Sequence, residues 1–102
     1  MRYIPRPGIV LTQVCGASLL VPNREASQFC PHIIRLSGMM ALDWKALCRG
    51  EELEVIYRAH EILKRISREE SVSEVDSALS MLCEKGFLIA VEDETEEGRS
   101  EA

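Results

Sequence analysis

The chain opens with a pattern typical of a β-hairpin. The stretch IVLTQVCGASLLVPN has two runs rich in Ile, Val, Leu and Thr on either side of a Cys-Gly-Ala break at residues 15–17. Glycine supplies the positive φ of a tight turn, and β-branched residues favour strands. We therefore expect strands at residues 8–14 and 18–22, joined by this turn.

A third strand is expected at residues 32–36, a short β-branched segment between a proline and a glycine. A sheet made of a hairpin and one late strand leaves an edge whose backbone N–H and C=O groups are unpaired. Such an edge can take up an extended peptide as an additional strand.

Three helices are expected after the strands. Ser37 can cap a first helix that ends at Gly50, because apolar residues recur between them at helical spacing. A third helix is expected to begin with Ser71 and Glu74 in capping-box spacing and to end at Gly86. A further strand is possible in the apolar segment that follows Gly86.

The second helix is expected between these two, from its own apolar stripe. The residues of the stripe are Leu53, Ile56, Ala59, Leu63 and Ile66. Two oppositely charged pairs with a spacing of four, Glu54/Arg58 and Glu61/Arg65, are expected on its solvent side.

Composition sets further limits on the domain. The chain has 102 residues, of which 46% are hydrophobic, which suffices for one domain with its own core. Its net charge of −5 is uneven, since residues 1–50 carry six Lys/Arg and two Asp/Glu whereas residues 51–102 carry six and fifteen. Six of these acids crowd into EDETEEGRSE, so we expect a domain at residues 1–91 and a disordered acidic tail at residues 92–102.

Targeting and cysteine signals are weak. No segment has the roughly 18 apolar residues that cross a bilayer, and MRYIPRPG lacks the apolar core of a signal peptide. We therefore expect a cytoplasmic protein without membrane contact. The four cysteines include no C-x-x-C pair, so we expect reduced, mostly buried thiols and neither a metal nor another cofactor.

Catalysis and nucleic-acid binding are both disfavoured. The chain has two histidines, His32 and His60, and neither lies in a catalytic signature or near a Gly-rich phosphate loop. For His60, beside the apolar positions of the second helix, we expect a surface or half-buried structural role. The third helix offers Lys85 against three acidic residues, whereas a helix that enters a DNA groove needs several cations.

Two segments resemble the PqqD-like proteins. The stretch LSGMMALDWKALCRG is similar to the first helix of that family, with matches at Leu36, Ser37, Trp44, Ala46 and Leu47. The family's final helix, D-V-x-x-F-L-x-x-L-x-x-x-G-L, is matched at Glu74, Val75, Ala78, Leu79, Leu82, Gly86 and Phe87. RPGIVL resembles the family's usual start, so the resemblance spans residues 5 to about 90. Ala78 stands where the family has a bulky aromatic residue, and the loop at residues 23–31 is longer than the family pattern.

This resemblance implies a winged helix-turn-helix that acts as a precursor-peptide recognition element in natural-product biosynthesis. Such an element is a non-catalytic chaperone or adaptor: it holds the leader of a ribosomally made peptide by strand addition and presents it to a modifying enzyme, often a radical S-adenosylmethionine maturase. The leader would lie along the third strand, at Ile33, Ile34, Arg35 and Leu36. The opposing wall would come from the third helix, through Glu74, Ala78, Met81 and Lys85.

Two alternatives stay open at this point: a winged-helix protein that binds DNA or acts in transcription, and a dimeric structural module whose open sheet edge pairs with a second copy. The expected fold class is the same for all three. It is α+β, with a three-stranded antiparallel sheet followed by three helices in a winged-helix-like arrangement, and with Trp44 buried against the third helix.

Overall fold

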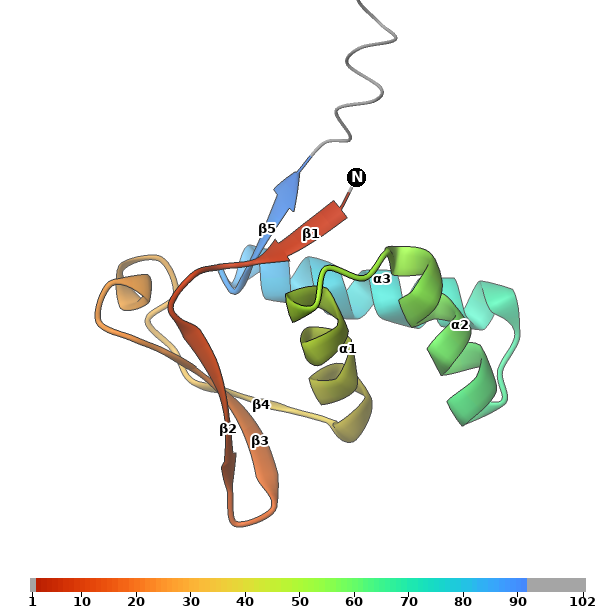
Figure 1. The fold of residues 1–102 in the computed structure, drawn as a ribbon, viewed down its shortest axis with the longest axis horizontal. Coiled ribbons are helices and arrows are strands. Elements are labelled where there is room, and N and C mark those ends of the chain that lie inside the picture. The colour runs from red at the N-terminus through yellow and green to blue at the C-terminus, as the bar shows by residue number, and fades with distance from the viewer. Residues whose placement is uncertain (1, 92–102) are drawn as a thin grey trace, which may run out of the picture.

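The computed structural model describes residues 2–91, which form three helices, five short strands and one turn of 3-10 helix (Figure 1). In chain order the elements are β1 (Arg2–Pro5), β2 (Ile9–Val14), β3 (Ala17–Pro22), η1 (Ala26–Gln28), β4 (Ile34–Leu36), α1 (Gly38–Cys48), α2 (Leu53–Lys64), α3 (Arg68–Glu84) and β5 (Leu88–Val91). The expected α+β class, with a three-stranded antiparallel sheet and three helices, is confirmed.

The predicted hairpin forms as β2 and β3, and β4 joins β3 to complete a sheet of order β2-β3-β4. Val14 pairs with Ala17, so the turn contains two residues, Cys15 and Gly16. Both have positive φ, 49° and 80°, as a type I′ turn requires. The third strand starts at Ile34, two residues later than predicted.

A second sheet has two strands, of which only one was predicted. The apolar segment after Gly86 does form a strand, β5, but its antiparallel partner is β1, which the sequence analysis did not predict. The register pairs Arg2 with Val91 and Pro5 with Leu88. The two ends of the described chain therefore lie side by side, above the helices in Figure 1.

One core joins the helices to the sheets. Its buried residues include Leu20 and Leu36 of the three-stranded sheet, Trp44 of α1, and Phe87 at the start of β5. Trp44 is buried as predicted, in the same core as the α3 stripe of Val75, Leu79 and Leu82. Helix α1 itself packs chiefly against β1, β4 and α2.

The predicted start of α3 is wrong by one turn. The helix begins at Arg68, and its capping box consists of Ser67 and Glu70 rather than Ser71 and Glu74. Ser71 is instead buried within the helix, where its hydroxyl donates a hydrogen bond of 2.6 Å to the carbonyl oxygen of Tyr57.

The predicted faces of α2 also need correction. Its buried residues are Ile56 and His60, whereas Leu63 of the predicted stripe is exposed. Neither predicted charge pair within the helix forms: Glu54 and Glu61 both bind Arg68 at the start of α3, at 2.6 and 3.1 Å.

All four cysteines are free thiols, but they are not mostly buried as predicted. Cys30 is buried and Cys83 is half-buried, whereas Cys15 and Cys48 are exposed. In the described part of the chain no helix has the length and apolar character needed to cross a membrane. The predicted acidic tail at residues 92–102 lies outside the described residues.

Substitution of Gly86 tests how tightly the chain is packed around this residue. Its φ of 90° is left-handed, and a Cβ there would lie 2.6 Å from the carbonyl oxygen of Phe29 and 3.2 Å from Cβ of Cys30. Gly16, with φ of 80°, has no atom within 4 Å of the same position. We expect Gly16→Ala to destabilise the fold by about 1 kcal/mol through backbone strain, and Gly86→Ala by about 3 kcal/mol or more.

Urea unfolding followed by circular dichroism measures both values. Equal losses for the two variants would mean that the Phe29 carbonyl moves away without cost, contrary to the packing described.

Candidate functional site

Strand β4 is an edge of its sheet within the described residues. In a hairpin with a two-residue turn the flanking pair, Val14 and Ala17, is hydrogen-bonded, and hydrogen-bonded pairs then alternate along the ladder. Residues of β3 therefore point their backbone groups alternately at β2 and at β4. Ser18 and Leu20 face β4, where they pair with Leu36 and Ile34. The N–H and C=O of Arg35 consequently face the open edge.

The side chains of this segment alternate as well. Leu36 is buried in the core and Ile34 is half-buried, whereas Arg35 is exposed. Ile33 precedes the strand and is 60% exposed. Of the four residues predicted to bind a leader, only Ile33 and Arg35 thus offer side chains to a partner.

A shallow hollow lies where the hairpin turn meets the start of α1. Its lining residues are Gly16, Ala17, Ser18, Arg35, Leu36, Ser37 and Gly38. It includes no residue of α3. Ser37 caps α1 here, since its hydroxyl accepts a hydrogen bond of 3.2 Å from the N–H of Met40, and the first turn of α1 contains no acidic residue.

The four predicted residues of α3 lie elsewhere. The main packing partners of α3 are α2 and β5, whereas those of β4 are β3 and α1. Ala78 and Met81 are half-buried and Lys85 is exposed at the end of the helix. The strand and helix halves of the predicted groove are therefore not brought together in this hollow, and the helical wall stays a prediction.

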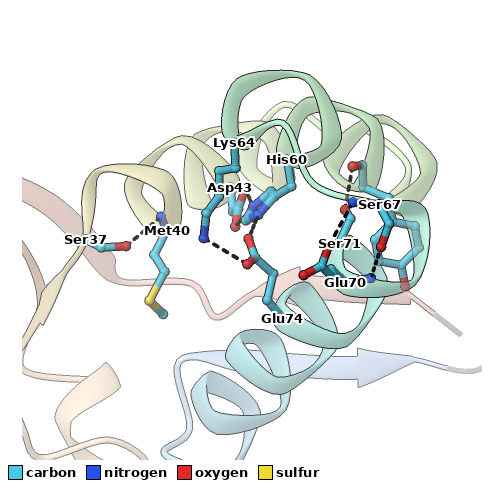
Figure 2. Close-up of polar contacts among 10 residues, drawn as sticks. Ser37, Met40, Asp43, His60, Lys64, Ser67, Glu70, Ser71 and Glu74 are labelled. Carbon is cyan, nitrogen blue, oxygen red and sulfur yellow. Dashed lines mark hydrogen bonds and ion pairs between the residues drawn. The ribbon is translucent and has the colours of Figure 1, made fainter.

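Glu74, the remaining predicted residue, belongs to a polar network that joins all three helices (Figure 2). At its centre is His60 of α2. Nε2 of this ring lies 2.8 and 2.9 Å from the two carboxylate oxygens of Asp43 on α1, and Nδ1 is hydrogen-bonded to Glu74 on α3. Lys64 completes the network, 2.8 Å from the other oxygen of Glu74.

This network places several ionisable side chains close together in the interior of the domain. A neutral imidazole has one N–H, so His60 can donate to both carboxylates only as the imidazolium, unless a carboxylate is protonated. With imidazolium, Asp43, Glu74 and Lys64 all ionised, the four charges sum to zero. Burial raises the pKa of Asp43, and the hydrogen bonds from His60 offset only part of that effect. The pKa of the more exposed Glu74 is lowered, first by Lys64 and then by His60.

The network is a structural brace rather than a reactive site. His60 and Asp43 are 3% and 4% exposed, so a substrate cannot reach them. In the described residues no buried side-chain nitrogen or oxygen lacks a hydrogen-bond partner. The expectation of a structural histidine is consistent with this arrangement, but the expected surface or half-buried position is wrong because the ring is fully enclosed. A histidine at a core-facing position of an amphipathic helix was the only sequence signal available.

A second, exposed network lies between α2 and α3. Arg68 binds Glu54 and Glu61, and its guanidinium lies 5.0 Å from the centre of the Tyr57 ring. The Tyr57 hydroxyl donates a hydrogen bond of 2.6 Å to Asp76. Burial, together with this bond to Asp76, raises the pKa of Tyr57 to about 12.

No protein-family model, no curated protein and no solved structure matches the chain. The resemblance to PqqD-like proteins therefore remains a hypothesis. Among residues 2–91, no group of three or more His, Cys, Asp or Glu side chains is arranged to hold a metal ion.

Removal of the histidine should destabilise the protein strongly. His60→Leu leaves the buried Asp43 carboxylate without a partner, and we expect a loss of about 3–5 kcal/mol in the free energy of unfolding. The double variant His60→Leu/Asp43→Leu should regain part of this loss because no buried charge remains. Lys64→Ala, which removes an exposed ion pair, should cost less than about 1 kcal/mol. Urea melts give the unfolding free energies of all three variants. A double variant less stable than His60→Leu would contradict the proposed structural role of the buried His60–Asp43 pair.

The network should also affect acid stability. Because the folded pKa of Glu74 is lowered, its ionised form contributes stability above the ordinary glutamate pKa of about 4.3, and this contribution is lost as the pH falls through the folded pKa. The difference in unfolding free energy between the native protein and Glu74→Gln should therefore shrink from about pH 6 to about pH 3. A difference that is constant over this range would show that Glu74 makes no charge-dependent contribution.

Proposed function

We propose that this chain is a non-catalytic, cytoplasmic peptide-binding adaptor. It holds an extended leader segment of a precursor peptide as an additional strand on β4 and presents the peptide to a modifying enzyme, such as a radical S-adenosylmethionine maturase. No cofactor of its own is needed, because binding consists of backbone pairing and side-chain contacts.

The open edge of β4 is the observation that carries this proposal. Arg35 directs both its N–H and its C=O away from the sheet, so one residue of an incoming strand can exchange two hydrogen bonds with it. This binding mode gains affinity from main-chain groups, which every peptide has. Specificity must then come from the side chains beside the edge.

Those side chains favour a particular kind of peptide. Arg35 on β4 and Ile33, which lies just before the strand, both have exposed side chains. An acidic residue opposite Arg35 and an apolar residue opposite Ile33 would form favourable cross-strand pairs. The adjacent hollow at the start of α1 leaves room for the end of such a strand.

Charge argues against the DNA-binding alternative. Within α3 there are five acidic residues and one cation, Arg68, which is already paired with Glu54 and Glu61. A helix of this composition would bring mainly negative charge to the phosphates of a groove.

The edge can be tested with proline. Arg35→Pro removes the outward N–H without removing a hydrogen bond of the sheet, so we expect the domain to fold but to bind the leader about tenfold more weakly. Arg35→Ala keeps the N–H and should show a smaller loss. Ile34→Pro removes a bond to Leu20 and should destabilise the fold itself. Fluorescence anisotropy with a labelled leader peptide encoded beside the gene gives the affinities, and thermal melts give the stabilities.

Hydrogen exchange provides an independent readout. Bound leader should protect the Arg35 amide from exchange, while the amides of Ile34 and Leu36 change little because they are already paired. Equal affinity of Arg35→Pro and the native protein would refute strand addition. Concentration-dependent protection of Arg35 without any peptide would instead favour the dimeric module, and tight binding of duplex DNA with a steep salt dependence would favour the nucleic-acid alternative.

A further inference from the structure

Helix α2 has an apolar face that the fold does not use. Val55, Ile62 and Leu63 are 46%, 68% and 60% exposed. With the half-buried Ala59 they follow the spacing i, i+4, i+7 and i+8 of a single helical stripe. A contiguous apolar stripe on a surface helix marks a site of association rather than scattered exposed residues.

The other faces of α2 are already occupied. Ile56 and His60 face the core, and the Ser71 hydroxyl of α3 binds the Tyr57 carbonyl. Glu54 and Glu61 face α3 as well, through Arg68. The apolar stripe is therefore a third face, turned away from the packing partners of the helix.

Two cations border this stripe. Arg58 lies one turn before Ile62 on α2, and Arg65 is the left-handed C-cap residue at which the helix ends. In the described part of the chain neither guanidinium has a carboxylate within ion-pair distance, whereas the neighbouring cations Lys64 and Arg68 are both paired. The face combines apolar side chains with two cations that form no direct ion pair within the described residues, on a protein whose net charge is −5.

We infer that this face of α2 docks an amphipathic helix of a protein partner, with acidic residues along one side of its apolar stripe. Such a helix would bury Val55, Ile62 and Leu63 and place carboxylates against Arg58 and Arg65. This inference does not depend on the peptide-binding proposal.

Other occupants fit less well. A second copy that docks through the same face would bring a second set of these two arginines to the interface instead of carboxylates. The chain's own acidic segment at residues 92–102 has the charge but, apart from one alanine, no apolar side chain to fill the stripe. An anionic membrane is disfavoured by the net charge of −5.

The position of the face suits an adaptor. In Figure 1, α2 lies at the opposite end of the long axis from the β2–β3 hairpin, with α1 between them. A partner helix on α2 would therefore leave the edge of β4 free.

Two synthetic helical peptides test the inference by fluorescence anisotropy. Both have Leu at i, i+3, i+4 and i+7 over 18 residues; one has Glu along the border of the stripe and the other has Lys at the same positions. The native protein should bind the Glu peptide at least about tenfold more tightly than the Lys peptide. Arg58→Glu/Arg65→Glu should reverse this preference, and Ile62→Ser/Leu63→Ser should weaken binding of the Glu peptide by about tenfold or more.

Val10→Ser is the matched control, because Val10 is 55% exposed on β2, in the other half of the molecule. It should leave binding unchanged, and the melting temperatures of all variants should stay close to native because the altered side chains are exposed. The inference is overturned by equal affinity for both peptides, by an equal effect of Val10→Ser, by tighter binding to phosphatidylglycerol vesicles than to the Glu peptide, or by dimerisation that Ile62→Ser/Leu63→Ser abolishes in sedimentation.

Discussion

The buried imidazole of His60 is the contact on which the arrangement of the helices depends. It bridges a carboxyl group of α1 and a carboxyl group of α3 from its position on α2, so each of the three helices contributes one ionisable side chain to a single point. Apolar contacts are non-directional, whereas a ring with two nitrogens at fixed positions makes directional hydrogen bonds. The network thus selects one orientation of α1 relative to α2 and α3, and α1 in turn continues directly from β4.

The two surfaces proposed for binding follow from that orientation. With Ile56 and His60 turned inward, the apolar stripe of α2 faces outward together with Arg58. At the other end of the molecule, the short β4 passes into α1 through the Ser37 cap, and no further strand of the described chain covers its edge. The two proposed surfaces would then bind their partners through different interactions. The edge of β4 would bind an extended peptide through directional backbone hydrogen bonds, and α2 would bind a folded helix through apolar burial with flanking charge.

Short sequence patterns predict much of this fold. The features that they do not predict depend on contacts between residues that are far apart in the sequence. The β2–β3 hairpin, the Ser37 cap and the burial of Trp44 follow from short patterns. Both S-x-x-E motifs near the start of α3 satisfy the capping rule, and the helix uses the earlier one because Ser71 and Glu74 are engaged with α2. Strand β1 is four residues long and its partner lies at the other end of the domain, so no local pattern identifies it. At the candidate site the sequence predicts the open edge of the sheet. It does not predict which backbone amide faces outward, because that depends on the strand register.

The pairing of β1 with β5 has a topological consequence. Arg2 and Val91 are direct cross-strand neighbours, so the described chain begins and ends at the same place, with opposite chain directions. Such a domain can be spliced into a surface loop of a larger protein without forcing the host's two chain segments apart. The two-stranded sheet also joins the most distant parts of the described chain, so this contact closes the longest loop, at the largest entropic cost.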